Sequence, residues 1–133
     1  SKGLPRQPRK DGHFAAMPYA DVPAFVARLR ERVSVGRLAL EALILTAARS
    51  GEIRGATWGE VDLAAGMWSV PAERMKMGRV HNVPLAPEAI EAFRRAETLR
   101  APCTDLAYPG QRLKQPISDM TLLKIMRDFE LPY

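Results

Sequence analysis

The stretch TAARSGEIRGATW (residues 46–58) contains the end of a long hydrophobic segment, LALEALILTAA (residues 38–48), and places Arg49 directly after it. Apolar residues on nearly all sides predict a buried helix, which we expect to span residues 35–49. Two explanations for Arg49 are open. An arginine in the last turn of a helix commonly binds the terminal carbonyls and complements the helix dipole. Alternatively, a rigid buried helix presents a planar, permanently charged group to an anion such as phosphate.

The residues after Arg49 predict a second, short helix. Ser50 and Gly51 turn the chain, and the hydroxyl of Ser50 can cap the new helix. Glu52 falls in the first turn, where a carboxylate is favoured by the helix dipole. We expect Glu52 to lie close enough to Arg49 to orient its guanidinium.

The composition is that of a globular protein. The chain has 133 residues, of which 47% are hydrophobic and 26% charged, enough for one domain with a core. The long hydrophobic segment contains Glu41 and is too short to cross a bilayer. The single cysteine, Cys103, excludes an internal disulfide and suits a reducing compartment. We therefore expect a cytoplasmic protein that does not insert into a membrane.

The net charge of +5 comes mainly from residues 1–17. The basic residues of this segment are Lys2, Arg6, Arg9 and Lys10. Residues 11–133 have 16 basic and 15 acidic residues, so only local clusters of charge can indicate binding to nucleic acid. Prolines, glycines and the lack of a hydrophobic period predict a basic linker or extended arm over residues 1–17.

Three more helices are predicted by hydrophobic spacing. They cover residues 20–33, with Asp21 at the N-cap, residues 86–99, and residues 119–129, with Ser118 as the cap. The positions expected to face the core are Val22, Phe25, Val26, Leu29 and Val33 in the first, Ile90, Phe93 and Ala96 in the second, and Met120, Leu123, Met126 and Phe129 in the third.

Short β-prone runs separate these helices. VDL (residues 61–63), MWSV (residues 67–70) and HNVPL (residues 81–85) predict a small three-stranded antiparallel sheet. The expected architecture is therefore an α+β fold that is mainly helical.

Several common chemistries are missing from the sequence. It has no P-loop, no G-x-G-x-x-G and no G-x-S-x-G motif. His13, His81 and Cys103 are too widely spaced to indicate a metal site. Arginine and lysine side chains remain as the candidate functional groups.

Four motifs in order resemble the catalytic domain of tyrosine recombinases, and among these the integrases of phages, prophages and genomic islands. ARSGEI (residues 48–53) follows a buried helix, W-x-x-V-D-L (residues 58–63) opens the sheet, and Lys76 falls in the hairpin before H-x-V-P-L (residues 81–85). The resemblance implies that residues 18–133 are the N-terminal part of this catalytic core.

The resemblance also implies a reaction. Enzymes of this family cut duplex DNA with a tyrosine hydroxyl, form a 3′-phosphotyrosyl link, release a 5′-hydroxyl, and rejoin strands by the reverse step. No metal or nucleotide cofactor and no small-molecule substrate is implied, and the parent protein is expected to assemble as a tetramer on DNA.

Residue roles follow from the same resemblance. Arg49 resembles the first catalytic arginine, which binds the scissile phosphate, and Glu52 its orienting partner. Lys76 resembles the general acid for the leaving 5′-oxygen, a role open to lysine because it can lose a proton. Further DNA contacts are expected from Arg74, Arg79 and Lys114.

The chain departs from the family pattern in one respect. Neither His13 nor His81 begins a His-x-x-Arg box, and Tyr19, Tyr108 and Tyr133 do not match the nucleophile. We therefore expect a truncated domain that is inactive alone. A non-catalytic DNA-binding remnant of an integrase and a plain helical interaction domain are the alternatives.

Overall fold

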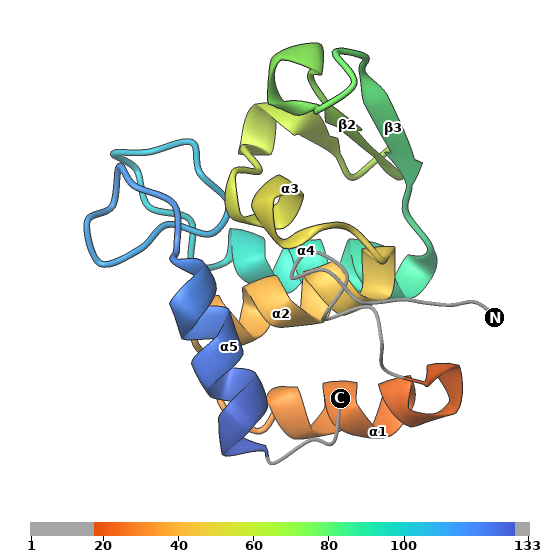
Figure 1. Cartoon of the computed structure of the whole chain (residues 1–133), viewed down its shortest axis with the longest axis vertical. Coiled ribbons are helices and arrows are strands. Elements are labelled where there is room, and N and C mark those ends of the chain that lie inside the picture. The colour runs from red at the N-terminus through yellow and green to blue at the C-terminus, as the bar shows by residue number, and fades with distance from the viewer. Residues whose placement is uncertain (1–17, 130–133) are drawn as a thin grey trace, which may run out of the picture.

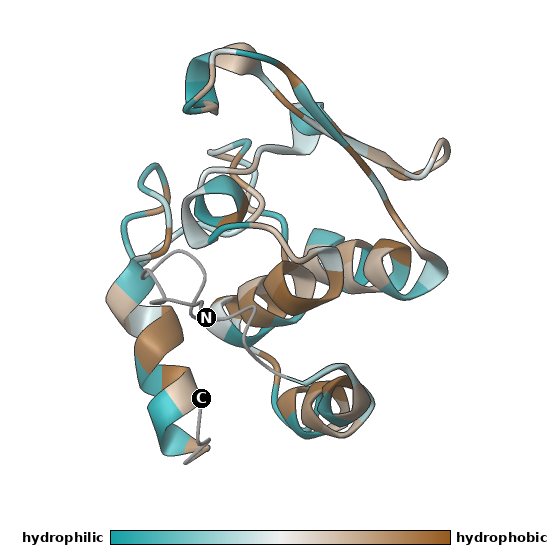
Figure 2. Cartoon of the chain, turned by 45° about the vertical axis from the view of Figure 1, so that its right-hand side comes forward, coloured by the Kyte–Doolittle hydropathy of each residue, from teal (hydrophilic) through white to brown (hydrophobic). Residues whose placement is uncertain are grey.

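The computed structural model describes residues 18–129, and the predicted basic arm lies outside them. The hydrophobic segment forms helix α2 (Val35–Thr46) at the centre of the fold (Figure 1). Ser34 caps this helix by accepting a hydrogen bond from the backbone N–H of Arg37 at 3.1 Å. Figure 2 shows that hydrophobic residues are concentrated on this central helix.

Three other helices pack around α2, namely α1 (Val22–Leu29), α4 (Pro87–Glu97) and α5 (Asp119–Asp128). The prediction of an inward-facing Val33 is wrong, because α1 ends at Leu29 and Val33 is 75% exposed. None of the helices in residues 18–129 is long and apolar enough to cross a membrane.

The buried face of α5 also differs from the prediction. Ser118 does cap the helix, accepting from the backbone N–H of Thr121 at 3.1 Å. However, Met120 is 60% exposed, and the buried residues are Leu122 and Met126. Met126 is buried as predicted, and Leu123 and Phe129 pack partly buried against the core, so the prediction is wrong at Met120 and missed Leu122.

The end of α2 corrects the predicted boundary at residue 49. Ala47 adopts a left-handed conformation (φ 55°), and its N–H donates to the carbonyl of Ile44. The N–H of Ala48 donates to the carbonyl of Leu43 at 3.3 Å, which completes a Schellman motif. The helix thus ends at Thr46, without the glycine that usually marks such a termination.

Helix α3 (Ser50–Arg54) begins immediately afterwards, with Arg49 at its N-cap position. Ser50 is the first helical residue rather than the cap, and its hydroxyl donates to a carboxylate oxygen of Asp119. This bond ties α3 to α5. Arg49 therefore starts a helix and does not finish one.

The predicted sheet is confirmed. Strands β1 (Val61–Asp62), β2 (Met67–Val70) and β3 (His81–Pro84) are antiparallel in the order β1-β2-β3. Trp68 pairs with Val83 across β2 and β3, and both are buried. The short 3-10 helices among residues 18–129 are η3 (Tyr19–Asp21), η4 (Trp58–Glu60) and η5 (Ala72–Arg74).

The sheet is joined to the helices by aromatic packing on Phe93 of α4. The ring centroid of Phe93 lies 6.0 Å from that of Trp68 in β2 and 6.1 Å from that of Tyr108. The sheet and α3 consequently lie on one side of α2, whereas α1 lies on the other (Figure 1). The mainly helical α+β architecture matches the prediction.

Candidate active site

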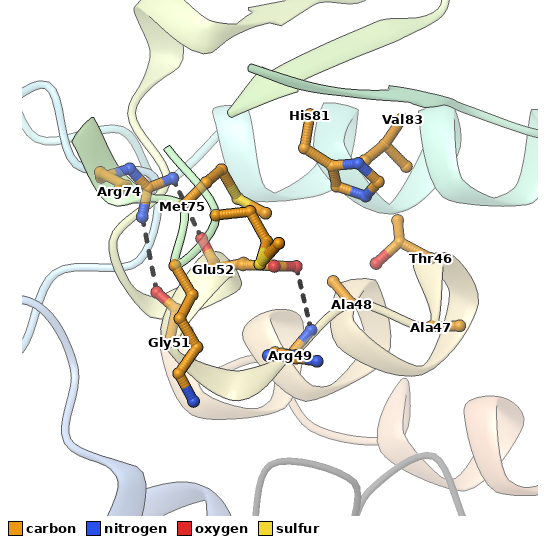
Figure 3. Close-up of a pocket in the computed structure, with 12 residues that line it drawn as sticks. Thr46, Ala47, Ala48, Arg49, Gly51, Glu52, Arg74, Met75, His81 and Val83 are labelled. Atoms are coloured by element: carbon orange, nitrogen blue, oxygen red, sulfur yellow. Dashed lines mark hydrogen bonds between the residues drawn. The ribbon is translucent and has the colours of Figure 1, made fainter. Parts of the chain in front are cut away.

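An open cleft of about 690 Å³ lies between the α2–α3 junction, the β2–β3 loop and strand β3. Arg49 and Glu52 contribute from the helical side, and Arg74 and Lys76 from the loop. Figure 3 shows Arg49, Glu52 and Arg74 close together, with His81 and Val83 of β3 farther along the cleft. The structure thus brings the two predicted catalytic residues, Arg49 and Lys76, into one site.

Arg49 is exposed, and its backbone is held firmly. Its N–H donates to Oε1 of Glu52 at 3.2 Å, as Glu52 closes the first turn of α3. The hydrogen bond between these two residues is therefore made to the backbone of Arg49, whereas the sequence led us to expect contact with its guanidinium. Within residues 18–129, the Arg49 guanidinium forms no ion pair.

Lys76 lies at the tip of a tight turn. The N–H of Gly78 donates to the carbonyl of Met75 at 3.0 Å, so Lys76 and Met77 occupy the two central positions. Gly78 has φ of 70°, which a glycine adopts without strain. Lys76 is exposed, and in the described part of the chain its ammonium has no ion-pair partner. It is available to an anion entering the cleft.

Arg74 is bound to the protein itself. Its Nη2 and Nε lie 2.7 and 3.1 Å from the two carboxylate oxygens of Glu60. The same guanidinium donates to the backbone carbonyl of Glu52 at 3.2 Å and to that of Gly51 at 3.5 Å. The other two predicted DNA contacts, Arg79 and Lys114, are exposed and do not line the cleft.

His81 is a cleft residue to which the sequence analysis assigned no role. It is the first residue of β3, and alternation along a strand places its side chain on the same face as Val83. Both line the cleft. The H-x-V spacing could have indicated the position of His81, because it predicts that the histidine and the buried valine share a face of the strand.

The tyrosines of residues 18–129 do not reach this cleft. Tyr108 is completely buried against Phe93, and burial raises the pKa of its hydroxyl above the ordinary value. Tyr19 is 93% exposed in η3, away from the lining residues. Tyr133 and His13 lie outside the described residues.

Comparison with known proteins identifies the family and the fold. The model of the phage integrase family matches residues 18–131, which include Arg49 and Lys76. The chain belongs to the phage integrase family. Among its relatives, the prophage integrase IntZ of Escherichia coli (strain K12) is 35% identical over 119 residues, covering 89% of this chain and 29% of IntZ.

A second integrase and one solved structure agree with this. The integrase of Enterobacteria phage P4 is 34% identical over 116 residues, covering 76% of this chain and 26% of the phage protein. The crystal structure of XerA recombinase superposes with a TM-score of 0.67 at 18% identity, over 84% of this chain and 40% of XerA, which shows a shared fold. This integrase-family chain therefore spans less than a third of the length of these two integrases.

Proposed function

We propose that this domain supplies half of a DNA breaking-and-rejoining site for site-specific recombination through a 3′-phosphotyrosyl intermediate. The observation that carries the proposal is the position of Arg49 and Lys76, which come from separate elements and line one cleft. Neither cation is ion-paired within the described residues, so both are available to a phosphate. Family membership supports DNA integration as the overall activity.

The chemistry divides between the two side chains. A deprotonated tyrosine oxygen attacks the scissile phosphorus, a new P–O bond to tyrosine forms, the P–O5′ bond breaks, and a proton goes to the leaving 5′-oxygen. Arg49 offers a permanently charged, forked donor to the phosphate oxygens, on which negative charge grows. Lys76 donates the proton, which arginine cannot do at accessible pH. We place the attacking tyrosine outside residues 18–129.

Duplex DNA is the proposed partner, and the parent protein is proposed to act as a tetramer on it in the cytoplasm. Arg79 and Lys114 are exposed cations that we assign to phosphate contacts. Such contacts contribute affinity that falls with salt and carry no sequence specificity.

A substrate whose leaving group needs no proton tests whether Lys76 is the general acid. In a recombinase containing this domain, Lys76→Ala should slow cleavage of ordinary DNA by roughly 10²–10⁴-fold. A 5′-bridging sulfur substrate should restore the rate, because a thiolate leaves without protonation. Arg49→Ala should stay slow on both substrates, and Lys124→Ala, on the exposed face of α5, should resemble the wild type on both. An undiminished rate for Lys76→Ala on ordinary DNA would refute the proposal.

A non-catalytic DNA-binding module is the second candidate, favoured by the absence of Tyr19 and Tyr108 from the cleft lining. In that case Arg49→Ala and Lys76→Ala weaken duplex binding, yet no covalent protein–DNA adduct forms with any substrate. Denaturing electrophoresis of the reaction separates the two candidates, since only the first yields an adduct.

A further inference from the structure

Arg74 lies two residues before Lys76 on the chain, and its guanidinium contacts helix α3, which has Arg49 at its N-cap. We propose that Arg74 is a positioning residue, which fixes the Lys76 turn against α3 and so sets the place of Lys76 relative to Arg49. The proposal rests on the function above, in which both cations act on one phosphate. It replaces direct DNA contact as the role of Arg74.

The contacts of Arg74 join three segments of the chain. Two N–H groups bind the carboxylate of Glu60 in η4, at 2.7 and 3.1 Å. Further donors reach the carbonyls of Gly51 and Glu52, in the first turn of α3. Arginine suits this position because its rigid fork of five donors can serve several acceptors at once.

The anchor for this arrangement is itself fixed. Oε1 of Glu60 also accepts from the indole N–H of Trp68 at 3.2 Å, and Trp68 is fully buried in β2. The Glu60 carboxylate is therefore held by the core of the sheet on one side and by Arg74 on the other. A charged pair held in this way keeps its geometry, unlike a pair between two mobile surface side chains.

Gly55 provides independent support, because it leaves the space that the guanidinium occupies. A Cβ atom built at Gly55 would collide with Nη1 of Arg74. With only 24% of its side chain exposed and its charge matched by Glu60, Arg74 offers little to a phosphate.

Whether Glu60→Gln strengthens or weakens duplex binding distinguishes the two possible roles of Arg74. If Arg74 binds DNA, Glu60→Gln frees its charge and strengthens duplex binding by this chain. If Arg74 positions the loop, Glu60→Gln weakens binding, as do Arg74→Ala and Arg74→Lys, roughly threefold each. Arg74→Lys is informative because it keeps the charge and loses the fork.

A double-mutant cycle then tests whether the effect passes through Lys76. Arg74→Ala should weaken duplex binding in the wild type and have no further effect in Lys76→Ala. Arg79→Ala, an exposed cation of the same loop, is the matched control and should have the same cost in both backgrounds. Additive losses of duplex binding for Arg74→Ala and Lys76→Ala, or wild-type duplex binding by Arg74→Lys, would overturn the inference. A Lys76→Ala variant that binds like the wild type while Arg74→Ala binds more weakly would also overturn the inference, whereas an undiminished cleavage rate of Lys76→Ala in a recombinase containing this domain would refute the proposed function.

A spectroscopic measurement without DNA completes the test. The chain has two tryptophans, so its NMR spectrum contains two indole N–H signals. Arg74→Lys should shift the Trp68 signal through Glu60, leave the Trp58 signal in place, and speed the exchange of the Gly78 amide in the Lys76 turn. An unchanged Gly78 exchange rate would show that Arg74 does not hold the loop, whatever the DNA measurements give.

Discussion

Arg95 and Glu41, 54 residues apart in the chain, form a two-point ion pair in the interior, with Nη1–Oε2 and Nη2–Oε1 distances of 3.0 and 2.8 Å. Arg30 donates two further hydrogen bonds to Oε2 of Glu41. The carboxylate is only 1% exposed, so a central charge on α2 is matched by arginines beside α1 and on α4. A buried carboxylate is tolerated only with such partners.

Replacing Glu41 by glutamine should be strongly destabilising. The change leaves two arginines around a neutral side chain, and we expect the free energy of unfolding to fall by about 3 kcal/mol. Urea unfolding of the chain measures the loss. Asp128→Asn, which breaks an exposed pair with Lys124, is the control and should change the value by less than about 0.5 kcal/mol. Equal effects of the two substitutions would contradict the assignment.

The same carboxylate should make the free energy of unfolding depend on pH. Burial opposes ionisation of Glu41, but the hydrogen bonds and charges of Arg95 and Arg30 outweigh it and hold its pKa below the ordinary 4.5. The unfolded chain therefore takes up the proton first. The contribution of Glu41 is complete above the ordinary pKa and is lost as the pH falls through the lower, folded pKa.

Urea unfolding between about pH 6 and about pH 3 measures this dependence. Glu41→Gln should show a smaller loss of stability over that range than the wild type. An identical slope for the two proteins would mean that Glu41 does not titrate as expected.

Removing the hydroxyl of Tyr108 should stabilise the domain. Within the described residues this buried oxygen has no hydrogen-bond partner, so folding strips it of water without compensation. Tyr108→Phe keeps the ring packed on Phe93 and should raise the free energy of unfolding by about 1 kcal/mol. Thermal or urea unfolding decides the point, with Tyr19→Phe at an exposed site as the neutral control. A clear loss of stability would show that the hydroxyl has a partner.

The cost of a methyl group at Gly55 should depend on Arg74. Gly55→Ala pushes the guanidinium away from Glu60, and we expect a loss of about 1–3 kcal/mol in the free energy of unfolding. In the Arg74→Ala background the collision is gone, so the same change should be nearly neutral. Urea unfolding of the wild type, the two single variants and the double variant gives the coupling free energy between Gly55→Ala and Arg74→Ala. Strictly additive losses would show that the methyl group does not collide with Arg74.

Much of the fold could be predicted because local signals agree with the final structure. The three β-prone runs formed the expected sheet, and Ser118 capped the helix that follows it. The end of α2 was missed because Ala47, and not a glycine, takes the left-handed position. Val33 and Met120 were misplaced because periodicity alone does not say where a helix ends or which neighbour covers it.

The site was predictable in its residues and not in its contacts. Arg49 and Lys76 belong to recognisable motifs, and the structure places both on one cleft. The partner of Arg74 was hidden, because Glu60 lies 14 residues away and meets it only when η4 and η5 fold together. The ion-pair partner of Glu41 was hidden for the same reason, since Arg95 belongs to another helix.

The left-handed turn at Ala47 has a consequence for the entropy of anion binding. The backbone before Arg49 is closed by the hydrogen bond from Ala48 to Leu43, and the backbone after it by the bond to Glu52. Folding has therefore already ordered the main chain at this position, and an arriving phosphate has only the rotamers of the Arg49 side chain left to restrict. Ordering one long side chain costs about 0.5–1.5 kcal/mol, less than ordering a loop. The absence of a glycine at residue 47 thus favours a rigid backbone for the residue that carries the Arg49 guanidinium.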